Sequence, residues 1–132
     1  MSRIELDTMY QDLPEILDGN KEKLVQRADE IGNYLGRQLS TSQIRNVFYE
    51  VKSMSSSDVE QLHLLRPKLA YLAGRHGHRR GNKLTGGIVT LQQIMDEAVK
   101  IVLQENTAER FKNFQSFFEA ILAYHKYYGG KD

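Results

Sequence analysis

The chain has 132 residues, of which 40% are hydrophobic and 27% charged, and its 18 Lys and Arg residues nearly balance 17 Asp and Glu residues. This composition is typical of one soluble globular domain and is too apolar for a disordered chain. Because there is no cysteine, disulfides and cysteine-based zinc sites are excluded, and a reducing, cytoplasmic compartment is expected. The acidic N-terminal stretch does not resemble a secretory signal, and the apolar runs are too short to span a membrane.

Helical periodicity dominates the first half of the sequence. Residues 1–20 are predicted to be either a short docked helix or a mobile segment. Residues 21–39 carry apolar side chains at spacings of three and four, which predicts one helix. Ser40 followed by Gln43 indicates a capping box and a new helix from about residue 41. The apolar positions are Leu13, Ile16 and Leu17 in the first segment, Leu24, Ala28, Ile31, Leu35 and Leu39 in the second, and Ile44, Val47, Phe48, Val51 and Met54 in the third.

The middle of the chain alternates between helix and loop signals. Residues 54–57 are predicted as a loop, and Ser57 with Glu60 indicates a second capping box. The helix that follows keeps its apolar phase up to Gly74. Pro67 lacks a backbone N–H, so this helix either kinks there or divides into two. Residues 74–87 contain five glycines and are predicted as the clearest loop of the chain.

A helix from Gly87 and a longer final helix complete the pattern, the latter opened by a third capping box of Asn106 and Glu109. The final helix has an aromatic excess, which predicts either a broad core face or a contact with another subunit. The core set is Phe111, Phe114 and Phe118, and the surplus set is Phe117, Tyr124 and Tyr128. The chain is therefore predicted to be an all-α, single-domain bundle of about five helices over residues 21–132, preceded by residues 1–20.

Positive charge is concentrated in one window of the sequence. Residues 61–95 hold six Lys and Arg residues and no Asp or Glu, whereas the rest of the chain holds 12 basic and 17 acidic residues. Such polarisation indicates a surface that binds a polyanion. A solvated basic face without a partner is the alternative. The six are Arg66, Lys68, Arg75, Arg79, Arg80 and Lys83.

Helical spacing places part of this charge beside tyrosine. Lys68, Tyr71 and Arg75 share one face of their helix, next to the buried leucine face. Arg45 and Lys52 share a face of the preceding helix, and Tyr49 lies between them. A tyrosine between two cations suits a phosphate backbone with a base stacked on the ring, although such tyrosines can also cap a core. The predicted glycine-rich loop adds three cations. Arg37 lies just before the helix that carries Arg45 and Lys52.

No catalytic or metal-binding pattern is present. His76 and His78 lie in a window without acids, so no ligand set or acid–base pair forms around them, and they are interpreted as loop residues. The spacing in residues 77–83 does not match a phosphate-binding loop. Adjacent acids such as Asp96 and Glu97 do not face one another on a helix. The chain is thus predicted to have no enzyme activity, metal or cofactor.

Three stretches in register resemble the small subunit of the type III-A CRISPR effector, the Csm complex. They are STSQIRNVFYEV (residues 40–51), LRPKLAYLAGR (residues 65–75) and FFEAILAYHKYYGG (residues 117–130), and the resemblance covers about residues 21–130. The resemblance implies a helical, non-catalytic protein, several copies of which line up along the effector complex. These copies would contact guide and target RNA mostly through the RNA backbone. The surface-facing polar positions that it carries over are Gln43, Arg45, Lys68, Tyr71 and Arg75.

The sequence therefore predicts a non-enzymatic subunit of an RNA-guided complex, with guide RNA, target RNA, the other Csm subunits and further copies of itself as partners. Two alternatives are a helical scaffold or homodimer whose basic window binds an acidic protein, and a ribonuclease that uses its histidines. Tyr124 and Lys126 fit either an RNA or a subunit contact. The predicted nucleic-acid-binding residues are Arg37, Gln43, Arg45, Lys52, Lys68, Tyr71, Arg75, Arg79, Arg80 and Lys83.

Overall fold

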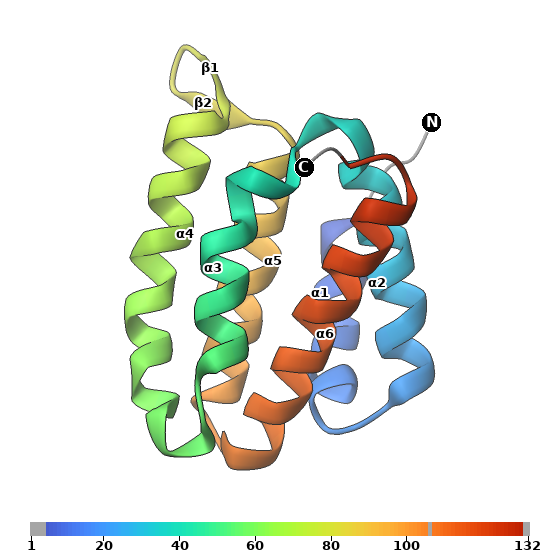
Figure 1. The fold of residues 1–132 in the computed structure, drawn as a ribbon, viewed down its shortest axis with the longest axis vertical. Helices are drawn as coiled ribbons and strands as arrows, with labels where there is room; N and C mark the ends of the chain where they lie inside the picture. The colour runs from blue at the N-terminus through green and yellow to red at the C-terminus, as the bar shows by residue number, and fades with distance from the viewer. Residues whose placement is uncertain (1–4, 106, 131–132) are drawn as a thin grey trace.

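The computed structural model describes residues 5–105 and 107–130, and in them six α-helices pack into one bundle (Figure 1). The helices are α1 (Leu6–Leu17), α2 (Lys21–Leu35), α3 (Thr41–Ser53), α4 (Leu62–His76), α5 (Gly87–Val102) and α6 (Thr107–Tyr127). Two 3₁₀ helices, η1 (Gly36–Gln38) and η2 (Ser56–Gln61), flank α3, and strands β1 (His78–Arg80) and β2 (Lys83–Thr85) form a hairpin between α4 and α5.

The predicted all-α class is confirmed, but the number of helices is six rather than about five. The additional helix is α1, in which Met9, Leu13, Ile16 and Leu17 are fully buried. Burying these four side chains removes enough apolar surface from water to hold a twelve-residue helix against the bundle. Of the two predicted states of the N-terminal segment, residues 6–17 thus adopt the docked helix.

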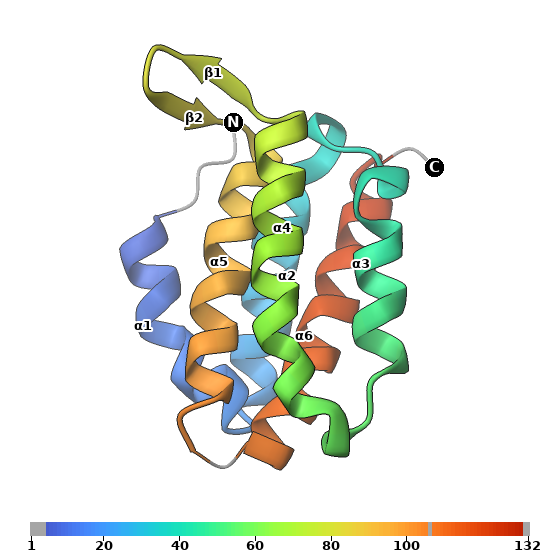
Figure 2. The ribbon, with the colours of Figure 1, turned by 90° about the vertical axis from the view of Figure 1, so that its left-hand side faces the viewer.

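Helix α3 lies between α4 and α6, with α1, α2 and α5 behind them in the view of Figure 1. Figure 2 shows that the β1–β2 hairpin projects past the end of the bundle, beyond α4 and α5. The hairpin, which carries Arg79, Arg80 and Lys83, therefore lies at one end of the bundle, next to the end of α4.

The apolar phases read from the sequence match the buried faces. All five predicted positions of residues 21–39 are buried, as are Leu65 and Leu69 of α4. The capping box at Ser40 is confirmed: the Ser40 backbone N–H donates to Gln43 Oε1 at 2.9 Å. Ile44, Val47 and Val51 then face the core from α3.

The prediction of the second capping box needs correction, and of the two alternatives at Pro67 the structure excludes the division into two helices. The second capping box is formed by Ser55 and Asp58, where the Ser55 N–H donates to Asp58 Oδ2 at 3.1 Å, so the prediction of Ser57 and Glu60 was wrong. The shorter aspartate reaches back to the cap, and Ser57 instead bonds the Ser55 hydroxyl. Pro67 neither ends nor divides α4, which is one helix with η2 before it. The predicted third box includes Asn106, which lies outside the described residues.

The aromatic surplus of α6 packs within the monomer, because α6 contacts α1, α2, α3 and α5 and needs a wide apolar face. Phe117 is fully buried, so of the two predicted alternatives it belongs to the core face and not to a contact with another subunit. Tyr124 and Tyr128 are half-buried. The Tyr128 hydroxyl donates to Asp29 Oδ1, and this bond raises the pKa of Tyr128 to about 12.

An ion pair links the end of α1 to α6; its Arg110 side chain is buried, whereas its Asp18 side chain is 46% exposed. Arg110 on α6 donates to both oxygens of Asp18 at 2.7 and 3.0 Å and to the Ile101 carbonyl at 2.9 Å. Periodicity gives no sign of this pair, because Arg110 occupies a buried position where an apolar residue is expected. Hydrogen bonds from Arg110 lower the pKa of the Asp18 carboxyl. Those from Lys23 and Arg27 lower the pKa of the Asp12 carboxyl.

We expect these two carboxylates to make folding stability depend on acidity. Because the pKa of each is lower folded than unfolded, their contribution is complete above the unfolded pKa of about 3.9 and is lost as the pH falls through the folded values. An Asp12→Asn/Asp18→Asn variant should thus be less stable than the wild type at about pH 7, with the difference shrinking towards zero at about pH 2. Thermal unfolding against pH measures it, with Glu60→Gln as an exposed control. A difference that does not change with pH would contradict this assignment.

Candidate nucleic-acid interface

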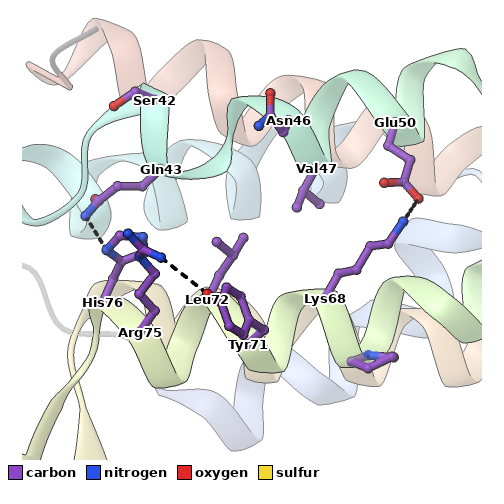
Figure 3. A pocket seen from close by; sticks show the side chains of 11 residues that line it. Ser42, Gln43, Asn46, Val47, Glu50, Lys68, Tyr71, Leu72, Arg75 and His76 are labelled. Carbon is purple, nitrogen blue, oxygen red and sulfur yellow. Dashed lines mark hydrogen bonds and ion pairs between the residues drawn. The ribbon is translucent and has the colours of Figure 1, made fainter.

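A groove of about 700 Å³ runs between α3 and α4 (Figure 3). We call it the α3/α4 groove. Its apolar lining is Val47 from α3 with Leu72 and the exposed Pro67 from α4, and the rest of its lining is polar. The polar lining is Ser42, Gln43, Asn46 and Glu50 from α3 and Lys68, Tyr71, Arg75 and His76 from α4.

The exposed face of α4 supplies the cations of this groove. Leu65, Leu69 and Ala73 turn inward, so Lys68, Tyr71 and Arg75 are left exposed on the neighbouring face. These three residues thus share one exposed face of α4, as their spacing predicts. The Arg75 guanidinium donates to the Tyr71 hydroxyl at 3.2 Å, so the two side chains hold each other at the rim of the groove.

Two side-chain bridges span the groove, one at each end (Figure 3). At one end Gln43 Nε2 lies 3.1 Å from His76 Nδ1. The Gln43 oxygen already accepts the backbone N–H of Ser40, so its amide nitrogen faces His76 and donates to Nδ1. This hydrogen bond to His76 explains why Gln43 belongs to the site although its side chain carries no charge.

At the other end Lys68 Nζ bonds Glu50 Oε2 at 2.6 Å. The sequence window of Lys68 contains no acid, but α3 brings one into contact from 18 positions away. Arg66 has a similar partner, because Asp96 of α5 lies 2.7 Å from its Nε. The hydrogen bonds that Arg66 donates to Asp96 raise the pKa of Arg66. The basic window is thus less positive in space than in sequence, and its unneutralised part lies towards Arg75 and the hairpin.

The segment predicted as a loop is a β-hairpin instead. Helix α4 continues to His76, and β1 and β2 then pair antiparallel around Gly81 and Asn82. Gly81 has φ of +62°, a conformation that glycine adopts without strain, which permits the two-residue turn. Pairing places Arg80 directly opposite Lys83, so two cations share one face of the hairpin. Like charges in this position repel, and a bound anion would relieve the repulsion.

The hairpin cations are exposed to solvent. Arg79, Arg80 and Lys83 make no ion pair with any carboxylate in residues 5–105 and 107–130. The hairpin follows Arg75 and His76 directly in the chain, so its charge extends that of α4. Together they place four exposed cations, Arg75, Arg79, Arg80 and Lys83, at one end of the molecule.

The remaining predicted residues lie elsewhere. Arg45 and Lys52 line a second, smaller groove of about 410 Å³ between α3 and α6, together with Phe48, Tyr49 and Lys126. Lys52 Nζ lies 5.9 Å from the centre of the Phe48 ring. Arg37 is exposed in η1, outside both grooves. The structure thus divides the predicted residues between the two sides of α3 instead of joining them all in one surface.

Sequence reasoning included Gln43 only through the family resemblance and missed the rest of the α3 side of the α3/α4 groove. Gln43, Asn46 and Glu50 follow one another at spacings of three and four, which places them on a single face. That spacing is visible in the sequence, but the face carries no positive charge, so a search for cations passed over it. No group of three or more potential metal ligands occurs in the described residues. None of the helices described is long and apolar enough to cross a bilayer.

Fold and surface together define a small helical protein with a cationic, grooved face. Comparison with known proteins identifies the family to which this helical protein belongs. A family model described as Csm2 Type III-A matches residues 18–131. The chain therefore belongs to the Csm2 family of type III-A CRISPR systems, and its resemblance to the small subunit of the Csm complex is confirmed.

Two curated relatives carry the name CRISPR system Cms protein Csm2. The protein of Enterococcus italicus is 28% identical over 127 residues, which cover 86% of this chain and 91% of the relative. The protein of Streptococcus thermophilus is 33% identical over 106 residues, which cover 79% of this chain and 82% of the relative. No solved structure gives a significant match to the chain.

Proposed function

We propose that this chain is a non-catalytic subunit of the type III-A Csm complex that binds the backbone of guide and target RNA without sequence specificity. The binding surface is the α3/α4 groove together with the hairpin. Its partners are the RNA strands, the other Csm subunits and further copies of the chain, and its location is cytoplasmic. The observation that carries the proposal is the run of exposed cations from Arg75 to Lys83, in which Arg80 and Lys83 repel across the hairpin.

The chemistry of this surface suits phosphate and not base recognition. Arginine and lysine on an exposed face neutralise phosphates whatever the sequence of the strand. Base pairing between guide and target would then supply the sequence information, and the protein would lower the repulsion between two polyanions. Lys68 contributes once a phosphate competes with Glu50 for it. Arg45 and Lys52 remain predicted contacts, because they lie on the other side of α3.

The salt dependence of RNA binding tests this proposal. With Lys68, Arg75, Arg79 and Arg80 each neutralising one phosphate, log affinity for single-stranded RNA should fall against log salt with a slope of about −3. Affinity should be weak and similar for RNAs of unrelated sequence. Fluorescence anisotropy with labelled RNAs over a range of salt concentrations gives both values. A flat salt dependence, or strong preference for one sequence, would contradict the proposal.

A further inference from the structure

Tyr71 is the feature of the α3/α4 groove that phosphate binding does not explain. Its side chain is 64% exposed, whereas a tyrosine on a helix ordinarily covers apolar surface with its ring. We propose that the α3/α4 groove binds an unpaired nucleobase of single-stranded RNA, stacked on Tyr71, with the adjoining phosphate at Arg75. This inference rests on the proposed function and specifies its ligand.

The position of Tyr71 is fixed before any ligand arrives. Arg75 donates to its hydroxyl across one helical turn, at 3.2 Å. A ring held in this way loses little conformational freedom when a base stacks on it, which favours binding. The same guanidinium keeps further N–H donors for a phosphate, because only one of its nitrogens bonds Tyr71 in the described structure. Base and phosphate of one nucleotide thus meet adjoining side chains.

The groove also has the size and lining that a nucleobase requires. About 700 Å³ is within the range of small-molecule sites, and the apolar side chains of Val47 and Leu72 in its lining suit a flat aromatic ring. Asn46 lines the groove and is exposed. Its side-chain amide has no hydrogen-bonded partner among the described residues. Its amide has a donor and an acceptor, so it can meet the edge of any base in some orientation.

Stacking distinguishes an unpaired base from a base pair. In a duplex each base face is covered by its neighbours, and only the phosphates and groove edges reach a protein surface. A strand without a partner strand exposes base faces, and every base offers the same aromatic surface to a tyrosine. The groove is therefore specific for unpaired RNA but tolerant of sequence. The cationic rim attracts RNA and an acidic peptide alike, so the preference for RNA comes from stacking of a base on Tyr71.

The test compares single-stranded RNA with a blunt duplex of the same sequence, using the full chain and a Tyr71→Leu variant. We expect Tyr71→Leu to bind the single strand about tenfold more weakly, with unchanged salt slope, and to bind the duplex within about twofold of the wild type. Tyr71→Phe should keep most of the affinity, because it retains the ring. Tyr127→Leu is the control, since this tyrosine is 77% exposed and lies outside the groove.

Photocrosslinking with RNA that contains 5-iodouridine gives a second, direct measurement. We expect the label on Tyr71 with the single strand and its loss when the strand is paired. Equal effects of Tyr71→Leu on single strand and duplex, a label confined to Tyr49, or competition by polyglutamate as strong as by RNA would overturn the nucleobase site. If Tyr71 has no effect while the salt slope of about −3 persists, only this inference fails. If the wild-type chain binds neither RNA, the proposed function fails with it.

Discussion

The Lys68→Ala/Arg75→Ala variant should bind single-stranded RNA about 50-fold more weakly than the wild type at about 50 mM salt. Each cation that neutralises a phosphate releases counterions and steepens the dependence of affinity on salt by about 0.7 for a single strand. Losing two such contacts should halve the slope of about −3. Folding should be unaffected, because both side chains are exposed and the buried face of α4 is made by Leu65, Leu69 and Ala73.

A variant that is expected to strengthen RNA binding provides the matched control. Glu50→Gln removes the carboxylate that holds Lys68 at 2.6 Å and that would repel a phosphate in the same groove. It should bind RNA more tightly than the wild type. Circular dichroism and chemical denaturation of each variant establish that the bundle is intact. If the double variant binds within twofold of the wild type, the α3/α4 groove is not part of the RNA-binding surface.

The Gly32→Ala variant should lose about 3 kcal/mol of folding stability, the upper end of the usual cost of overpacking. An added Cβ would lie 2.5 Å from the Cβ of Tyr124 and 2.7 Å from the His125 backbone nitrogen. These are atoms of another helix and not the ends of flexible side chains, so α2 and α6 would have to separate. The two helices form the most extensive contact of the bundle, and both neighbouring core faces would be disturbed.

Gly74 offers a control of the same chemistry. It also lies within a helix, is exposed, and an added Cβ there meets nothing within 4 Å. Gly74→Ala should therefore stabilise the protein by about 0.5–1 kcal/mol, since alanine loses less backbone entropy on folding. Urea denaturation of both variants gives the comparison. Equal effects of the two substitutions would show that α2 and α6 do not approach closely at Gly32.

The parts of the fold that sequence predicted are those that depend on local spacing. The buried positions of α2, the cap at Ser40 and the shared face of Lys68, Tyr71 and Arg75 all follow from a period of about 3.6 residues. The hairpin was missed because its strands are three residues long and flanked by glycine, which is also what a loop looks like. Sequence alone does not decide whether α1 forms, because a short amphipathic segment is a stable helix only when the bundle buries it.

The candidate site was predicted in its charges but not in its arrangement. Sequence showed which residues are cations, yet Glu50 and Asp96 neutralise two of them from other helices. Which groove a residue of α3 enters depends on how α3 packs between α4 and α6, and this is a property of the tertiary fold. Arg45 and Gln43 are two positions apart and therefore lie on different sides. Arg110 could not be found, because a buried arginine is recognised only with its partner Asp18.

The salt slope of RNA binding, measured side by side for the wild type, Lys68→Ala/Arg75→Ala and Arg79→Ala/Arg80→Ala, tests the central claim most directly. If α4 and the hairpin hold one RNA backbone together, the slope should fall from about −3 to about −1.5 in each double variant, because each loses two of four phosphate contacts. Three identical slopes would show that the strand lies elsewhere on the molecule, and that these cations are only solvated surface charge.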